Sequence, residues 1–325
     1  TGNGITDRGD ASGTGWWSSR KNKYVQEVLD HPLVGLKPSM LPQVLQPNEI
    51  AGKINNDAAD WTGLRVGIPV ACGTGDNAAA ALGLAVKPGI PVISLGTSGT
   101  AYTLSLKAPA DVSGQVFAHA SASGEHLPLT CTLNATLAVD NIAGMLSLDR
   151  VAVADQTRVV VMPYLSGERL PNYPDARGSV VGIDHTTTPG EILLAAYEGV
   201  AYSLVQSIEV LHAHSSGIDS DAPIILVGGG AKGKIWQKTI SRLSGRELVI
   251  PKSGELVAYG AAAQAAGILN NEAAVDVASR WNVSEGLRLA ASAIDSEAIE
   301  RNKCIREATH ELNSRGFFII PQSRT

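Results

Sequence analysis

The stretch that decides the fold runs from residue 72 to residue 100 and reads CGTGDNAAAALGLAVKPGIPVISLGTSGT. It contains a glycine loop that ends in Asp76, an alanine-rich segment, and a second loop of glycines and hydroxyl side chains. This order predicts a carboxylate at the start of a helix, followed by a strand and a tight turn.

Asp76 is predicted to lie at a turn between a strand and a helix. The apolar run 66–71 predicts a buried strand, and the alanines and leucines of 77–86 predict a packed helix. Gly73 and Gly75 remove side-chain bulk from the turn, so a ligand can approach the carboxylate closely. The position also suits an aspartate that only caps a helix, and the sequence alone leaves this alternative open.

The second loop is predicted to be the tip of a hairpin. Residues 90–95 and 100–106 predict two strands, and the turn between them consists of Gly96, Thr97, Ser98 and Gly99. A glycine-rich turn exposes consecutive backbone N–H groups, and the two hydroxyls add donors. The turn can therefore hold phosphate oxygens without a charged residue, although the same four residues also suit an ordinary hairpin.

A third glycine cluster follows a predicted strand, 223–227, and precedes a predicted helix, 234–243. It places glycines at the three positions of the dinucleotide-binding fingerprint, namely Gly228, Gly230 and Gly233. That fingerprint also requires an acidic residue at the end of the next strand, where this chain has Ile250. The dinucleotide interpretation is weakened, whereas a nucleotide lying against the glycine turn remains plausible.

Together these segments resemble the FGGY family of carbohydrate kinases, in the superfamily that shares the actin and hexokinase ATPase core. The most specific match is 178–183 followed by 191–198, which fits the family's second signature. Four further segments occur in the family's order and approximate spacing: 6–14, 73–77, 94–100 and 228–232. The resemblance implies an α/β fold of two ribonuclease H-like domains with a cleft between them.

The resemblance also implies ATP-dependent phosphorylation of a sugar. Asp76 would be the general base that takes the proton from the attacking hydroxyl, and Asn77 would help to orient the sugar. Mg²⁺ would neutralise charge on ATP. The residues that would bind ATP are Gly96, Thr97, Ser98, Gly99, Gly229, Gly230, Ala231 and Lys232, and a solvated helix start is the alternative for the lysine.

By similarity of 6–14 and 73–77, D-xylulose is the expected sugar. Kinases of L-ribulose, glycerol and gluconate share the ATP motifs, so these substrates stay open as alternatives. Two readings outside sugar phosphorylation also remain: a non-catalytic, actin-like module that binds ATP or senses a sugar, and a dinucleotide enzyme that uses the Gly228 turn.

We expect residues 1–88 to be the remainder of an N-terminal sugar-binding domain and residues 89–325 to be a C-terminal nucleotide-binding domain. The family's Asp-x-Gly-Thr phosphate loop and its Met-His sugar-binding segment do not occur in the chain, and 140–163 is shorter than the family's segment. We therefore expect the first part of the N-terminal domain to be absent and the chain to be incomplete for turnover.

Composition limits the classes of partner. With 325 residues and 44% hydrophobic content, the chain can bury a large core in more than one domain. A net charge of −5 without a basic cluster argues against nucleic acid, and the longest apolar stretch, 78–86, is too short to cross a membrane. Three scattered cysteines indicate reduced thiols in a cytoplasm and no structural zinc. A homodimer is compatible with the resemblance, although the sequence does not determine the oligomeric state.

The remaining features are given structural roles. His212 and His214 are expected at the end of a helix, 191–214, rather than on a metal. Glu168 and Arg169 are expected to form an ion pair that orders their loop. Trp16 and Trp17 are expected to pack on the domain core or on a partner subunit rather than to form a platform for a sugar. Helices are also predicted for 21–29 and 257–269, and a terminal helical region with a polar face for 285–315.

Overall fold

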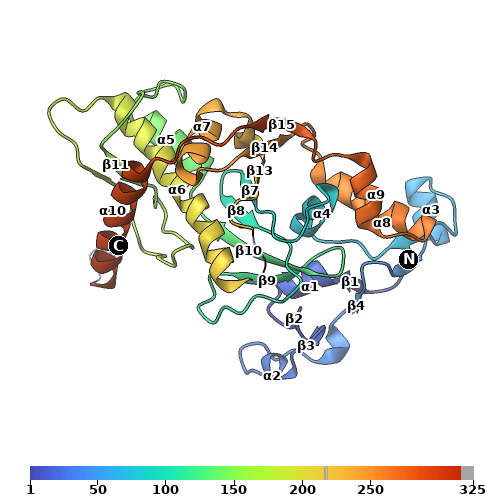
Figure 1. Ribbon diagram of the computed structural model, residues 1–325. Helices are drawn as coiled ribbons and strands as arrows, with labels where there is room; N and C mark the ends of the chain where they lie inside the picture. The colour runs from blue at the N-terminus through green and yellow to red at the C-terminus, as the bar shows by residue number, and fades with distance from the viewer. Residues whose placement is uncertain (216, 218, 316–325) are drawn as a thin grey trace.

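The structure, a computed structural model, describes residues 1–215, 217 and 219–315. Its centre is a seven-stranded mixed sheet in the order β15-β14-β13-β7-β8-β10-β9 (Figure 1). Three parallel strands form the middle: β7 (Val92–Leu95), β13 (Ile224–Val227) and β14 (Leu248–Pro251). Antiparallel strands extend the sheet on both sides: β8 (Gly99–Tyr102), β9 (Phe117–Ala120), β10 (His126–Thr132) and β15 (Gly286–Leu289).

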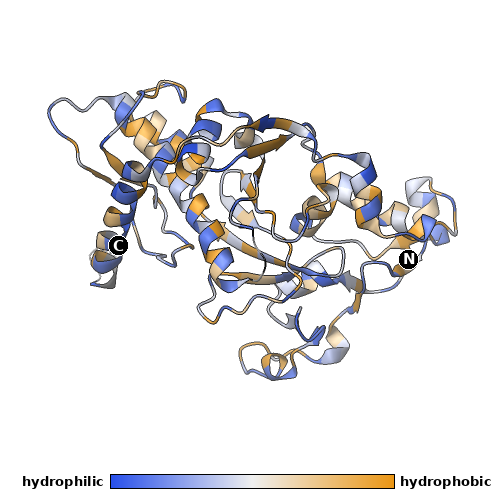
Figure 2. Ribbon diagram, viewed as in Figure 1, coloured by the Kyte–Doolittle hydropathy of each residue, from blue (hydrophilic) through white to orange (hydrophobic). Residues whose placement is uncertain are grey.

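Helices cover both faces of the sheet. One face packs against α5 (Thr136–Met145), α6 (Pro189–His214) and α7 (Lys234–Ser244), and the other against α4 (Asp76–Gly83), α8 (Leu256–Asn270) and α9 (Ala274–Trp281). Figure 2 shows the apolar residues concentrated in the central strands and on the helix faces that meet them. All four residues of β13 are buried, as expected for a parallel strand covered on both faces.

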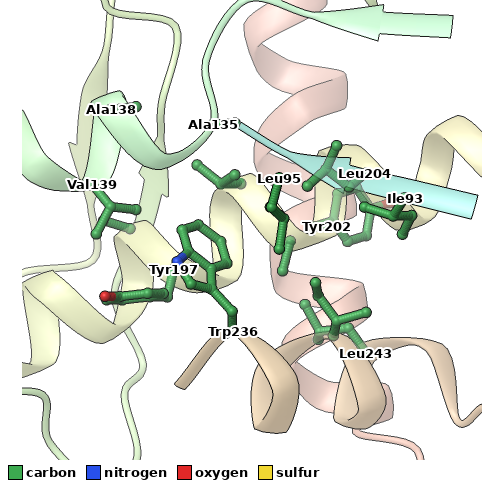
Figure 3. Packing of buried hydrophobic residues seen from close by; sticks show 14 of the residues in the cluster. Ile93, Leu95, Ala135, Ala138, Val139, Tyr197, Tyr202, Leu204, Trp236 and Leu243 are labelled. Carbon is green, nitrogen blue, oxygen red and sulfur yellow. The ribbon is translucent and has the colours of Figure 1, made fainter. Parts of the chain in front are cut away.

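Side chains of β7 alternate between the two cores because successive strand residues point to opposite faces. Ile93 and Leu95 belong to the core under α5, α6 and α7, where Figure 3 shows them near Leu204 of α6. Val92 belongs instead to the core under α4, α8 and α9, together with Tyr102. The end of β7 is therefore fixed from both sides, which matters for the turn that follows it.

Residues before α4 form small elements beside the main sheet. Two-stranded pairs join β1 (Ile5–Asp7) to β4 (Gln43–Leu45), β2 (Trp17–Ser18) to β3 (Lys23–Tyr24), and β5 (Ile50–Lys53) to β6 (Pro69–Ala71). Short helices lie between them: α1 (Arg8–Gly13), α2 (Gln26–Leu29), a 3₁₀ turn at Pro38–Met40, and α3 (Asn56–Thr62). Further along the chain, β11 (Val160–Met162) pairs with β12 (Ser179–Val181), and α10 covers Ser296–Ser314.

Most of the predicted elements are confirmed, including α4, the β7–β8 hairpin, β13 followed by α7, and α8. The 26-residue helix α6 begins with a capping box between Thr188 and Glu191 and ends at His214, as the sequence predicted. Trp17 is buried beside Ala11 and Ala120, which confirms its structural role. No helix of the described residues has both the length and the apolar content that a membrane span needs.

Three expectations about secondary structure were wrong. The run 66–71 is not a buried strand: β6 covers only Pro69–Ala71, pairs with β5 alone, and is left exposed or half-buried. The helix expected over 21–29 covers only Gln26–Leu29, because Lys23–Tyr24 forms a strand that pairs with Trp17–Ser18. The start of 285–315 is strand β15, because pairing with the edge of β14 overrides the weak local helix preference.

Candidate functional site

Asp76 is the first residue of α4, and Gly75 occupies the N-cap position without any side-chain cap. The carboxylate therefore does not take the N-cap role that the sequence left open. Its Oδ1 accepts hydrogen bonds from the backbone N of Asn77 at 2.7 Å and from Asn77 Nδ2 at 2.9 Å. The side chain is exposed, so Oδ2 is open to a ligand.

Asp76 and Asn77 line a cavity of about 90 Å³ whose other walls come from α1 and from the β9–β10 hairpin. Two polar residues that line this cavity, Asp10 and His119, were not among the predicted site residues. A Cβ atom built on Gly75 would lie 2.5 Å from Asp10 Oδ1, so a side chain there would push the second carboxylate away from its present position. Asp10 lay within the segment 6–14 that carried the family resemblance, whereas His119 gave no sequence signal.

The electrostatic environment of this cavity shifts both of these groups. Burial raises the pKa of Asp10, and the negative charges of Asp7 and Asp76 raise it further. Burial lowers the pKa of His119, although a hydrogen bond to the Gly9 backbone and the two nearby carboxylates oppose that effect. The cavity therefore favours a protonated Asp10 and a neutral imidazole more than water would.

A second, larger cavity of about 840 Å³ lies beyond the carboxyl ends of β7 and β13. Such ends of parallel strands are the usual place for ligands in α/β sheets. Five of the eight residues predicted to bind ATP line this cavity: Gly96, Thr97, Gly229, Gly230 and Lys232. Of the other three, Ser98 is exposed at the hairpin tip, Gly99 is buried at the start of β8, and Ala231 is buried in the core.

The glycines after β13 are required because their turn packs directly on the end of β7. Gly228 has a φ of +87°, and a Cβ atom there would lie 2.5 Å from the carbonyl oxygen of Leu95. A Cβ atom on Gly230 would lie 2.9 Å from Leu95 Cβ and 2.9 Å from Thr136 Cγ2. The two glycine loops are far apart in the sequence but form one continuous wall of the larger cavity.

At the hairpin tip, two carbonyl groups accept hydrogen bonds from the start of α5, and two backbone amides make no hydrogen bond to the described residues. The Gly96 carbonyl accepts from the backbone N and the hydroxyl of Thr136 at 3.1 and 2.8 Å, and the Thr97 carbonyl accepts from Ala135 N at 3.2 Å. The Gly96 amide donates to the Ser98 carbonyl at 3.1 Å. Within the described chain nothing accepts from the Thr97 and Ser98 amides, so these two N–H groups are the ones that can bind an anion.

Two aromatic side chains that were not among the predicted site residues form one wall of the larger cavity. Trp236 of α7 and Tyr197 of α6 pack edge to face with ring centroids 4.6 Å apart (Figure 3). The Tyr197 hydroxyl donates to the carbonyl of Arg150, which also lines the cavity. Trp236 had appeared in the sequence only as one apolar position in a helical repeat. Tyr197 lay within the family signature 191–198 but was given no role there, and nothing marked Arg150.

Glu168 orders its loop in a different way from the predicted ion pair. Its buried carboxylate accepts hydrogen bonds from Leu133 N at 2.6 Å, Asn134 Nδ2 at 3.0 Å and Arg169 N at 2.7 Å. Because these donors satisfy the carboxylate, the Arg169 guanidinium is free to lie over the Phe117 ring, 4.5 Å from its centroid. The expected ion pair was wrong.

Two further observations bear on ligands. Among the described residues none lines both cavities, so the Asp76 loop borders a different space from the glycine loops after β7 and β13. Across the described residues there is no group of three or more His, Cys, Asp or Glu side chains able to hold a metal ion. His214 lies at the end of α6 beside the Ala110 carbonyl and 3.9 Å from Asp111.

Comparison with known proteins matches two segments of the chain to models of one protein family. The N-terminal domain of the FGGY family of carbohydrate kinases matches residues 1–83, and its C-terminal domain matches residues 92–267. The xylulose kinase of Streptomyces rubiginosus is 49% identical over 316 residues, which is 97% of this chain and 64% of the relative. The xylulose kinase of Streptomyces coelicolor is 52% identical over 304 residues, covering 93% of this chain and 61% of the relative.

A solved structure has a similar fold. The xylulose kinase of Bifidobacterium adolescentis superposes with a TM-score of 0.76 at 29% identity and covers 93% of this chain and 62% of that one. The chain thus spans a little under two thirds of the length of the curated relatives it matches. Its mixed α/β architecture is the actin/hexokinase-like ATPase fold of sugar kinases. The chain belongs to the FGGY family of carbohydrate kinases.

Proposed function

We propose that the protein transfers the terminal phosphoryl group of ATP to D-xylulose, giving D-xylulose 5-phosphate. The observation that carries this proposal is the exposed carboxylate of Asp76 at the start of α4, facing a cavity at the end of a glycine loop. The names of the relatives similar to nearly the whole chain support D-xylulose as the sugar. L-ribulose, glycerol and gluconate are the alternatives for the experiment to compare.

In this proposal Asp76 is the general base. Asn77 holds Oδ1 through two N–H groups, which orients the carboxylate and leaves Oδ2 for the attacking hydroxyl of the sugar. Asn77 Nδ2 lies at the same edge of the cavity and would help to orient the sugar. Phosphoryl transfer needs positioning and charge stabilisation more than covalent chemistry from the protein, so one well-placed base is sufficient.

ATP would occupy the larger cavity. Its base and ribose would lie against Gly229, Gly230 and the ring of Trp236, and its phosphates would extend past the free amides of Thr97 and Ser98 toward Asp76. Ser98 and Lys232 are exposed and can reach phosphate oxygens, whereas Gly99 and Ala231 would act by shaping the backbone. Closure around the ligands would exclude water that competes with the sugar for the phosphoryl group.

Mg²⁺ fits the site as an ion held chiefly by ATP. The described residues offer no group of three ligands, and Mg²⁺ in kinases is commonly held by one or two carboxylates together with substrate phosphates. When bound, the ion would neutralise charge on the phosphates. We assign none of this chain's residues to it.

The proposal extends to organisation and location. Residues 1–88 would belong to the sugar-binding domain and residues 89–325 to the nucleotide-binding domain. The three cysteines are free thiols, one of them exposed, which suits a cytoplasmic enzyme that acts on small molecules.

The test is a coupled ADP-release assay with the full-length protein that contains this chain, using D-xylulose, L-ribulose, glycerol and gluconate as acceptors. We expect the highest kcat/KM with D-xylulose. Asp76→Ala should lower kcat by about 10³-fold, because general-base catalysis contributes on the order of 10²–10⁴. Near-normal turnover by the variant would remove Asp76 from the role of base.

Ligand binding is tested separately on the 325-residue chain by thermal unfolding with ADP or with NAD. Saturating ADP at a hundred times its Kd stabilises by about 2.7 kcal/mol. We expect ADP to raise the Tm of wild type and of Asp76→Ala alike, because Asp76 does not line the nucleotide cavity. Stabilisation by NAD alone would instead support the dinucleotide alternative.

A further inference from the structure

Helix α8 lies against the helix that carries Asp76 so closely that the two backbones are in contact. A Cβ atom built on Gly260 of α8 would lie 1.9 Å from the carbonyl oxygen of Ala79, and one on Gly83 of α4 would lie 2.2 Å from the carbonyl oxygen of Leu256. Glycine on each helix therefore removes the spacer that side chains normally provide. The body of α4 is fixed to α8, but this contact does not reach the loop in front of Asp76.

Gln264, one turn further along α8, does reach that loop. The residue is 2% exposed. Its Nε2 donates to the carbonyl oxygen of Gly73 at 3.0 Å and to Cys72 Sγ at 3.2 Å. Both acceptors lie just before Asp76 in sequence, although Gln264 is 191 residues away from Gly73. A buried amide that has lost such partners is costly, so this contact favours one loop conformation over others.

The loop needs such a contact because its own chemistry holds the Gly73 carbonyl only through the weak thiol donor Cys72 Sγ, at 3.1 Å. Gly73 and Gly75 give the backbone wide freedom, and Gly73 has a φ of +84° with open space where a side chain would be. Gly75, the N-cap residue of α4, carries no side chain to secure the helix start. A shift of about 1 Å in a catalytic group can cost on the order of 10² in rate.

We propose that Gln264 is a positioning residue that sets the direction of the Asp76 carboxylate by holding the Gly73 carbonyl. This inference rests on the proposed function of Asp76 as the base. Gln264 does not line the cavity of Asp76, so it acts through the loop rather than on the sugar.

The chain offers a matched control on the nucleotide side. Gln237 of α7 is also buried, and its Nε2 donates to the carbonyl oxygen of Ala231 at 2.8 Å, in the glycine turn that lines the larger cavity. The two glutamines make the same kind of contact with the two loops. Removing one amide should therefore disturb one loop and leave the other in place.

The first experiment measures the loop itself, on the 325-residue chain. The Ala79 amide donates to the Gly75 carbonyl at 2.8 Å, so its hydrogen exchange reports opening of the loop and the first turn of α4. Gln264→Leu should speed exchange in a peptide covering 72–80 by about tenfold or more, and Gln237→Leu should not. Unchanged exchange in Gln264→Leu, or equal acceleration in both variants, would overturn the proposal whatever the protein's activity.

The second experiment measures turnover with the full-length protein. Gln264→Leu should lower kcat by about 10- to 100-fold with little change in the KM for D-xylulose or in ADP binding, whereas Gln237→Leu should chiefly weaken ADP binding. On an Asp76→Ala background, Gln264→Leu should lower the residual kcat no further, because its effect passes through Asp76. A further loss by the same factor would show that Gln264 does not act through Asp76.

The outcomes separate this inference from the proposed function. If Asp76→Ala turns over normally, the assignment of the base fails first. If Asp76→Ala is inactive and Gln264→Leu has wild-type kcat, only the positioning role fails. Should Gln264→Leu not fold, Gln264→Met keeps the length of the side chain without its amide and is held to the same exchange and kcat criteria.

Discussion

The close contact between α4 and α8 predicts that Gly260→Ala destabilises the protein, although alanine is the better helix former. A Cβ atom at residue 260 would start 1.9 Å from the Ala79 carbonyl oxygen, where real Cβ contacts do not fall below 3.0 Å. The two helices must therefore separate by about 1 Å, which is overpacking that typically costs about 1–3 kcal/mol. The gap also weakens neighbouring contacts of Leu82, because about 1 Å of separation forfeits a quarter to a half of each dispersion well.

A gain in helix propensity partly offsets this loss of stability. Alanine exceeds glycine in helix propensity by about 1 kcal/mol, so the net loss expected for Gly260→Ala is about 0–2 kcal/mol, to which the weakened contacts of Leu82 add. Gly144 in α5 is the matched control, since a Cβ atom there would meet nothing within 4 Å. Gly144→Ala should raise the free energy of unfolding by about 0.5–1 kcal/mol.

The assay is urea unfolding of the 325-residue chain, followed by far-UV circular dichroism, with m-values compared to confirm that the transitions are alike. We expect opposite signs for the two alanine substitutions. If Gly260→Ala is as stable as Gly144→Ala, the helices can separate freely and the packing argument is refuted.

Two further predictions concern buried or crowded carboxylates. Asp10→Asn should raise the Tm at pH 7, because burial and the charges of Asp7 and Asp76 raise the pKa of Asp10 and disfavour its ionised form in the folded protein. The gain in Tm should disappear below about pH 4, where the carboxyl group is protonated in both the folded and the unfolded state. An equal gain in Tm at both pH values would contradict this explanation. Glu168→Gln should lower the free energy of unfolding by about 2 kcal/mol in urea melts, because the NH₂ group of glutamine would replace a carboxylate oxygen that accepts hydrogen bonds from N–H groups. Glu297→Gln is the control, because that side chain is 93% exposed, and it should change the free energy of unfolding by less than about 0.5 kcal/mol.

The sequence predicted the features that depend on local chemistry. Alternating and continuous apolar runs located β7, β8 and β13, and the glycines after β13 identified a turn that needs close approach. Asp76 was located correctly at a helix start because the glycine loop and the alanine run meet there. In each case the neighbours in sequence are also the neighbours in space.

Features made by distant segments escaped prediction. Asp10 and His119 meet Asp76 only because α1 and β9 pack against each other, which no local pattern encodes. The 66–71 run looked like a core strand, but the sheet that would have buried it does not include β6. Gln264 sits in an alanine-rich helix, where a single polar residue is more often solvated, and only the packing of α8 shows what it bonds.

The packing of α4 also indicates how Asp76 and the turn of the β7–β8 hairpin are related. In sequence, Asp76 falls within the match to the N-terminal family domain, and the hairpin 96–99 falls within the match to the C-terminal one. In space, Ala78 and Leu82 of α4 belong to the same core as Val92 of β7, the strand that leads into that hairpin. Asp76 and the hairpin turn are therefore carried by one packed unit, and their relative position is set by core packing. If that unit holds the phosphates in line with Asp76, substitutions such as Gly260→Ala should lower kcat as well as stability, although they touch neither ligand.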